Sequence, residues 1–325
     1  MQFLKLAAAA LASALLIPAA ALAQGPPPPT AVNGNPVHTL AGAGSIQSPV
    51  AFAFGAGKVF VASGGAEDGS SPGGIYTAGG GTAAKVPNSP KFVGGLVWHK
   101  GVLYVSGDQK LLAYSGWNGT KFAKVKTLFK GPKHFPGFGG ITWHKGRIWA
   151  GVMISNFKYD SRKSPQPYAQ SVVSLKPNGK DIQVYASGLR EPWQLTFVKG
   201  IKNPFVSVLG QDNLKKGPPD YIIHPHKGDD YGFPKCNWNQ PKACKPYAKP
   251  FLFLAPHASP MGIGAIGKTI YVALFGKQEV DTFKATGGKT KPFLTGFAAP
   301  VTGLGIHSGT VYASDLTGAV YGVKP

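Results

Sequence analysis

A twelve-residue pattern occurs twice in this chain with few changes, as GGLVWHKGVLYV at residues 94–105 and GGITWHKGRIWA at residues 139–150. Looser copies begin at Pro49, Pro192, Pro260 and Pro300. A unit that recurs every ~40 to 70 residues is typical of a repeat architecture. We therefore expect the repeat to determine the fold, and function to reside where the chain departs from it.

Each copy has the pattern of a β-hairpin. In the first close copy the side chains of residues 96–99 alternate in direction, Lys100 and Gly101 form the turn, and residues 102–105 return as a β-branched and aromatic strand. A third apolar strand follows in all six units, at residues 73–78, 110–115, 171–176, 219–225, 279–285 and 319–325. A fourth follows in some units, at residues 123–129 and 182–187.

Four antiparallel strands in each of six units, with no amphipathic helix, predict an all-β fold, a six-bladed β-propeller. The last unit reaches the end of the sequence after its third strand. Residues 37–42 (VHTLAG) are then expected to supply its fourth strand and close the ring.

This architecture assigns loops to two faces. The turns between first and second strands share one face, which we call the far face. The loops that lead into the first strands, and those between second and third strands, share the near face. Propellers usually bind ligands where near-face loops converge on the channel. His99 and His144 lie in far-face turns, so we expect both to be turn residues and not catalytic.

The chain is expected to be an exported protein with one folded domain. Residues 1–23 combine Lys5, an Ala/Leu core and an Ala-x-Ala ending, as a secretory signal peptide does. Residues 24–36 look like a flexible leader, and residues 37–325 form the propeller. No later segment is apolar enough to span a bilayer. The expected location is the periplasm or the extracellular space, and a retained membrane anchor fits the short apolar run less well.

Cys236 and Cys244 are the two cysteines, and they lie in a Pro-containing loop. In an oxidising compartment such a pair predicts a disulfide. A metal site would need more Cys or His residues at ligand spacing.

The net charge of +21 comes almost entirely from lysine. Nucleic-acid binders usually cluster arginine with aromatic residues, whereas these lysines are scattered through turns, so no nucleic-acid partner is expected. They include Lys58, Lys85, Lys100, Lys145, Lys199 and Lys268. Attraction to anionic envelope or polysaccharide surfaces, and adaptation to an acidic medium, both remain open.

The longest near-face loops cover residues 63–74, 155–170 and 209–220, and an insertion in the fourth unit runs to His257. Within residues 185–264 the chain contains GLREP at 188–192, PPDY at 218–221, YGFPKC at 231–236 and PHASPMG at 256–262. In this order, these motifs resemble the glucose/sorbosone dehydrogenase family. The family consists of exported six-bladed propellers that oxidise sugars with pyrroloquinoline quinone and calcium.

The resemblance implies a site for each part of that chemistry. Gly210 and Gln211 correspond to the backbone carbonyls that hold calcium, with Asp212 beside them. Open, oxygen-rich backbone suits a hard cation, although an ordinary Gly-Asp turn is the other interpretation. His134 is the nearest counterpart of the histidine that takes the proton from the sugar hydroxyl, and an exposed loop histidine is the other interpretation.

The sequence departs from the family around the quinone. Glu191 follows Arg190 where the family usually has an asparagine that contacts the cofactor. The arginines expected to pair with cofactor carboxylates are absent from residues 297–303. The loop at residues 274–279 is short, and Lys277 is its one candidate anion contact.

Three functions are therefore compatible with the sequence. The first is an exported sugar dehydrogenase-like propeller, dependent on quinone and calcium if active, with a small aldose or sorbosone-type sugar as substrate. The second is a non-catalytic propeller whose basic near face binds an anionic glycan or an envelope partner. The third, a lactonase-type metal hydrolase, needs several carboxylates around the channel, and the 13 acidic residues offer few in the near-face loops.

Overall fold

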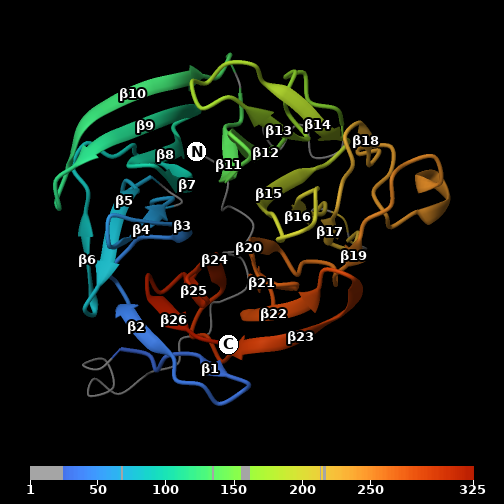
Figure 1. Ribbon diagram of the computed structural model, residues 1–325. Coiled ribbons are helices and arrows are strands. Elements are labelled where there is room, and N and C mark those ends of the chain that lie inside the picture. Colours follow the sequence, from blue (N-terminus) through green and yellow to red (C-terminus); the bar gives the residue numbers. More distant parts are fainter. Residues whose placement is uncertain (1–24, 67–68, 134, 155–161, 213, 215–216) are drawn as a thin grey trace.

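A computed structural model confirms the six-bladed β-propeller, with six sheets arranged around a central channel (Figure 1). It describes residues 25–66, 69–133, 135–154, 162–212, 214 and 217–325. Blade one consists of β3 (Pro49–Gly55), β4 (Lys58–Ser63), β5 (Gly74–Gly79) and β6 (Thr82–Lys85). Blade two consists of β7 (Val93–His99), β8 (Val102–Gly107), β9 (Lys110–Trp117) and β10 (Phe122–Lys130).

The other four blades follow the same order from the channel outward. Blade three consists of β11 (Phe138–His144), β12 (Arg147–Val152), β13 (Ser171–Leu175) and β14 (Gln183–Ser187). Blade four consists of β15 (Glu191–Thr196), β16 (Phe205–Leu209), β17 (Tyr221–Ile223) and β19 (Leu252–Phe253). Blade five consists of β20 (Pro260–Ile266), β21 (Thr269–Leu274), β22 (Glu279–Lys284) and β23 (Gly287–Thr295). Blade six contains β24 (Val301–His307), β25 (Thr310–Asp315) and β26 (Val320–Val323).

An N-terminal strand closes the ring, as the sequence predicts. Strand β2 (His38–Ala41) pairs antiparallel with β26 and becomes the fourth strand of blade six. One more pairing lies in the segment expected to be a flexible leader, where β1 (Thr30–Ala31) pairs with β23 at the outer edge of blade five. Part of that segment is therefore held on the propeller by backbone hydrogen bonds.

The glycine pair that opens each close copy of the repeat allows the blades to approach one another. A Cβ atom on Gly95 would lie 2.6 Å from the carbonyl oxygen of Gly139, and one on Gly139 would lie 2.6 Å from that of Trp193. These distances are too short for carbon and oxygen in van der Waals contact. The glycines are thus required where the inner strands of blades two, three and four meet.

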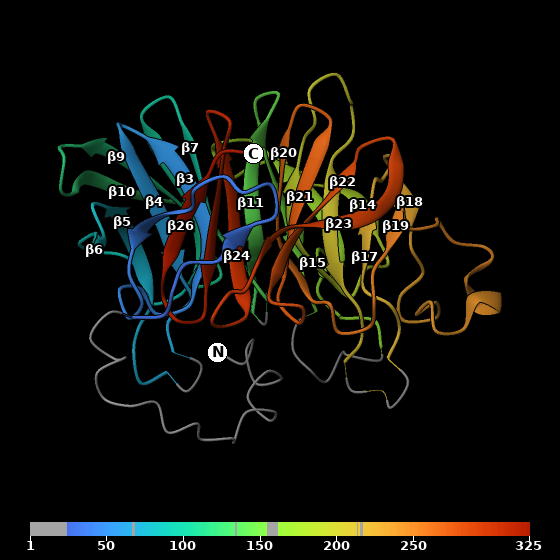
Figure 2. The ribbon, with the colours of Figure 1, turned by 90° about the horizontal axis from the view of Figure 1, so that it is seen from below.

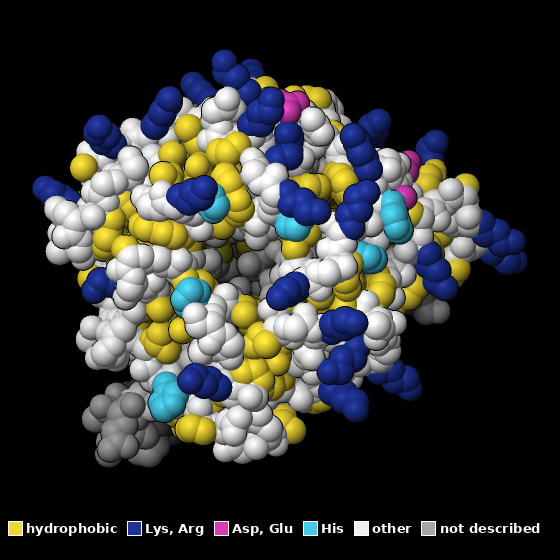
Figure 3. Space-filling view, viewed as in Figure 1, with side chains coloured by type: hydrophobic (Ala, Val, Ile, Leu, Met, Phe, Trp, Pro, Cys, Tyr) yellow, Lys and Arg dark blue, Asp and Glu magenta, His cyan; other side chains and the backbone are white. Residues whose placement is uncertain are grey.

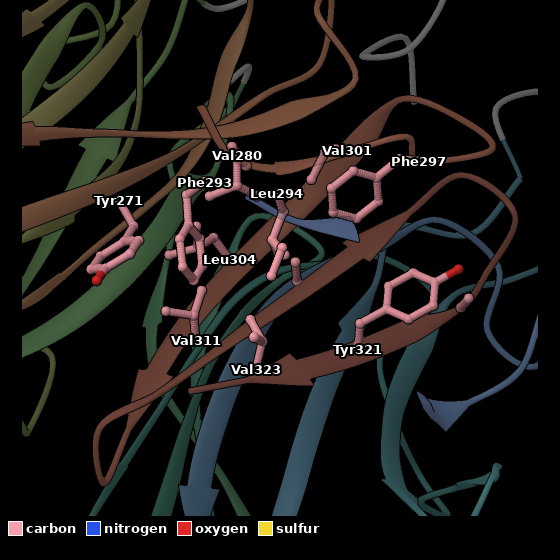
Figure 4. Close-up of a cluster of buried hydrophobic side chains, with 14 residues drawn as sticks. Tyr271, Val280, Phe293, Leu294, Phe297, Val301, Leu304, Val311, Tyr321 and Val323 are labelled. Carbon is pink, nitrogen blue, oxygen red and sulfur yellow. The ribbon is translucent and has the colours of Figure 1, made fainter. Parts of the chain in front are cut away.

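Apolar side chains fill the space between blades. Figure 4 shows one such cluster, in which Phe293 and Leu294 of blade five meet Leu304 and Val311 of blade six. Serine hydroxyls add polar contacts at the same boundaries: Ser106 donates to the carbonyl of Phe138 in the next blade. Ser207 and Ser314 make the corresponding bonds to Met261 and Pro49. A buried serine hydroxyl thus forms a hydrogen bond across every second boundary between blades, namely two to three, four to five and six to one.

The two histidines of the repeat lie on the far face and contact the next blade. His99 stacks on Trp143, with ring centroids 3.8 Å apart, and His144 stacks on Phe197 at 3.6 Å. Burial, with the neighbouring charge of Lys145 as a second cause, lowers the pKa of His144. Both histidines thus join neighbouring blades.

The insertion in the fourth unit lies outside the ring of blades. It contains β18 (Asp229–Asp230), which pairs in parallel with β14 of blade three, and the short 3₁₀ helix η4 (Pro241–Cys244). The disulfide between Cys236 and Cys244 is present, as predicted, and both cysteines are buried. Among the described residues no helix is long and apolar enough to cross a membrane.

Candidate functional site

The near face carries the longest departures from the repeat, at the lower edge of the disc in Figure 2. Blades four and five supply its charged residues. Arg190 and Glu191 lie where the chain enters β15, Asp212 lies between β16 and β17, and His257 precedes β20. The resemblance placed candidate residues in the first three positions, and the structure brings them together.

Arg190 is the centre of this group. Its side chain is 1% exposed, and Nη1 donates to the Gly210 carbonyl at 2.6 Å and to Oε2 of Glu191 at 3.0 Å. Oδ2 of Asp212 lies 3.7 Å from the same nitrogen. A buried guanidinium requires such partners, because an unpaired charge is costly inside a protein. Arg190 therefore ties the start of β15 to the loop that follows β16.

Asp220 links this loop to blade five. Its two carboxylate oxygens accept hydrogen bonds from the backbone N–H of Gly210, at 2.5 Å, and of Ser259, at 2.6 Å. Burial raises the pKa of Asp220 to about 6, although both hydrogen bonds favour the ionised form. A carboxyl group that titrates near neutral pH thus holds two near-face loops together.

Asp212 and His257 form a pair that the sequence did not reveal. Nδ1 of His257 lies 3.5 Å from Oδ1 of Asp212, and the imidazole is 55% exposed. The two residues are far apart in the chain and belong to different blades. His257 lies within the motif PHASPMG, which supported the family resemblance without indicating a role for the histidine.

Lys277 lies on the near face but its charge is already neutralised. Nζ lies 3.0 Å from Oε2 of Glu279 and 3.0 Å from Oδ2 of the buried Asp281. Desolvation by itself lowers the pKa of Lys277, but the hydrogen bonds to Asp281 and Glu279 outweigh it, and the pKa is raised. This lysine is therefore a charged partner of two carboxylates and does not point to an external anion.

The structure does not support the calcium site. The Gly210 carbonyl accepts a hydrogen bond from Arg190, so a cationic side chain already occupies the oxygen that the metal would need. In the part of the chain that the structure describes, no group of three His, Cys, Asp or Glu residues could hold a metal ion. His134, the predicted base, lies outside the described residues.

Most of the described acidic residues lie on the near face. Seven are at near-face ends of strands or in near-face loops: Asp108, Glu191, Asp212, Asp220, Glu279, Asp281 and Asp315. The opposite face has few of them: Figure 3 shows lysine and arginine side chains over all parts of it and few acidic ones. The fold therefore concentrates carboxylates on the near face, while basic residues lie on both faces.

Comparisons with known proteins support the fold. No family model and no curated protein matches the chain. Among solved structures, a glucose dehydrogenase-type oxidoreductase from Thermus thermophilus is 17% identical, with a TM-score of 0.71 over 89% of this chain and 100% of that one.

Two aldose sugar dehydrogenases are similar to the same degree. The Streptomyces coelicolor enzyme, solved with pyrroloquinoline quinone bound, is 18% identical, with a TM-score of 0.70 over 92% of this chain and 99% of that one. The soluble Escherichia coli enzyme, solved in its apo form, is 15% identical, with a TM-score of 0.69 over 89% and 99%. At these identities the likeness establishes the propeller fold of the sugar dehydrogenases, which the sequence motifs implied.

Proposed function

We propose that this chain is a sugar-binding propeller of the sugar dehydrogenase type, and that a small sugar binds on the near face beside Asp212 and His257. The observation that carries the proposal is the pairing of this half-exposed imidazole with a carboxylate on a sugar dehydrogenase fold. Carboxylate, imidazole and backbone groups are suitable partners for sugar hydroxyls, which both donate and accept hydrogen bonds.

The pair also has the arrangement of a general base. Nδ1 of His257 faces Asp212, so Nε2 is the ring nitrogen that would accept a proton from a sugar hydroxyl. Arg190 holds Asp212 from the buried side at 3.7 Å, which fixes the position of the carboxylate. This assigns proton transfer to His257, within the described part of the chain.

Oxidation of the sugar also needs an acceptor for the hydride. The acceptor that the resemblance implies, pyrroloquinoline quinone, carries three carboxylates, whereas both candidate cations, Arg190 and Lys277, are already paired with acidic residues. The two cations that the sequence suggested for the cofactor are therefore already paired, no calcium site is found among the described residues, and the proposal includes no step on either group. Export to the periplasm or beyond remains part of the proposal, and the disulfide is the feature that supports it.

The test is sugar binding by calorimetry, with a panel of aldoses, on the wild type and on His257→Gln. We expect the substitution to weaken binding about tenfold or more, because the hydroxyl loses a hydrogen-bonded partner. His226→Gln is the matched control, since His226 also faces an aspartate, Asp229, at 3.8 Å, but on the far face. If no aldose binds, or both variants behave alike, the proposed site is wrong.

A second measurement addresses the oxidation. Pyrroloquinoline quinone and calcium are added to the protein, and dye reduction is followed with the sugars that bind. We expect binding without reduction. Reduction that depends on both additions would contradict this expectation, and would establish the quinone-dependent dehydrogenase instead.

A further inference from the structure

The far face presents one lysine from each of five blades. Between first and second strands, or at the first residue of the second strand, the blades carry Lys58, Lys100, Lys145, Lys199 and Lys268, all exposed. In blade six the exposed residues His307 and Ser308 occupy the turn. Because the six inner strands are six or seven residues long and begin at the same face, their turns all lie on the far face, where the longer connection of blade four rises above the others (Figure 2). The five side chains, which we call the lysine ring, therefore surround the channel mouth.

The lysine ring is not neutralised by nearby carboxylates. Of the acidic residues described, only Asp181, Asp229 and Asp230 lie toward the far side or its outer edge. Asp181 is paired with Arg147 and Lys176, and Asp229 faces His226. None of the ion pairs between described residues involves a lysine of the ring. The ring is thus a set of unpaired positive charges at the tips of five rigid hairpins.

The shape of this face favours a flat partner. A cavity of about 340 Å³ opens at its centre, and the ends of all six inner strands line it, among them Phe54, Trp98 and His307. The mouth is therefore round, with the lysines around it, as in the middle of Figure 3. A linear polymer would bind best along a groove, whereas a planar anionic surface can meet all five tips at once.

We propose that the far face docks on an anionic lipid bilayer through the lysine ring. A lysine near such a surface strengthens binding about fivefold, and the effect is lost beyond a Debye length of ~8–10 Å in ordinary salt. Five lysines in turns on one face can therefore act on such a surface together. Docking in this orientation turns the near face toward the solvent, where a small solute can reach it. The proposal does not depend on the function proposed for the near face.

The experiment is co-sedimentation of the purified protein with vesicles. One set contains phosphatidylglycerol and phosphatidylcholine in equal parts, and the other contains phosphatidylcholine alone. We expect binding to the anionic vesicles only, and its loss at high salt. Changing all five lysines of the ring to glutamine should weaken binding at least 100-fold, at ~5-fold per residue.

A matched variant changes five exposed lysines at the outer blade edges, with the same loss of net charge. These are Lys124, Lys126, Lys130, Lys289 and Lys291, on β10 and β23. We expect it to keep most of the affinity, and thermal unfolding of both variants checks that they fold.

Three results would overturn the proposal. The first is no sedimentation of the wild type with anionic vesicles at low salt. The second is an equal loss in both five-lysine variants, which would mean that net charge alone attracts the protein. The third is binding to a soluble anionic polysaccharide such as alginate without binding to vesicles, which would identify a different partner.

Hydrogen exchange measures the orientation of the bound protein. Vesicles should protect the far-face turns at residues 99–101 and 144–146, and protection of the near-face loops instead would contradict docking through the far face.

Discussion

The two faces of this propeller differ in regularity and in charge. The far face consists of hairpin turns that repeat from blade to blade, and the five lysines of the ring have no acidic partners among the described residues. The near face consists of loops of unequal length whose charges are paired and partly buried, around Arg190 and Lys277. The contrast shows that the repeat determines the structure of the far face, whereas individual ion pairs and hydrogen bonds outside the repeat stabilise the near face.

The largest expected effect comes from removing the buried cation of the near face. Arg190→Met leaves the carboxylate of Asp212 and the carbonyl of Gly210 with one partner fewer, and should cost about 3–5 kcal/mol of unfolding free energy. The far-face equivalent, Arg147→Met, breaks an ion pair with the exposed Asp181, so its loss should be much smaller. Urea unfolding measures the free energy of unfolding of both variants. Equal losses would show that the paired cation of the near face is no more important for stability than that of the far face.

Asp220→Asn should have the next largest effect. An amide can accept from only one of the two backbone N–H groups, so we expect a loss of about 1–3 kcal/mol. Because the folded pKa is raised to about 6, the stabilisation by the protonated carboxyl is complete below the unfolded value of 3.8 and is lost as pH rises through 6. The stability gap between wild type and variant should therefore narrow between pH 4 and pH 7. If the difference in stability widened over this range instead, the pKa of Asp220 would not be raised by burial.

On the far face, His144→Phe should produce an effect that appears only in acid. The folded pKa of His144 lies below its ordinary value of 6.5, so its contribution to stability is present above pH 6.5 and is lost as pH falls through the folded pKa. Phenylalanine keeps the stacking on Phe197 without binding a proton. We expect nearly equal thermal stability at pH 8 and a more stable variant at pH 5. A difference of the same size at both pH values would argue against the titration of His144.

The smallest effect is expected in the lysine ring. Lys268→Gln changes an exposed turn residue without an ion pair among the described residues, and should shift the unfolding free energy by no more than ~0.5 kcal/mol. Thermal unfolding at low salt measures it. A clear stabilisation would show that the ring lysines repel one another strongly enough to strain the fold.

Most of the fold follows from the sequence, because the repeat has the alternation of a β-hairpin and the missing fourth strand has an obvious counterpart at residues 37–42. The grouping of turn lysines on the far face could also have been derived. Five of the six turn lysines named from the sequence fall in turns between first and second strands, or on the residue that follows such a turn, so the propeller places them on one face; Lys85, at the end of β6, is the exception.

The site was much less predictable, for two physical reasons. The direction of a backbone carbonyl is not encoded by residue type, so nothing in the sequence shows that Gly210 faces Arg190 and is not free for a metal. The pair Asp212 and His257 joins loops of neighbouring blades, and their distance depends on how those blades pack. The motifs point to residues 185–264, but they do not encode which groups in that region contact one another.

Blade six draws its strands from both ends of the chain, since β2 pairs with β26, and Asn35 also donates to the carbonyl of Lys324. During synthesis β2 emerges long before its partner β26. The ring therefore cannot close until β26 has been synthesised, and until then the backbone edge of β2 lacks the strand that covers it. Loss of β26 would leave the ring open and this edge exposed for pairing with another chain.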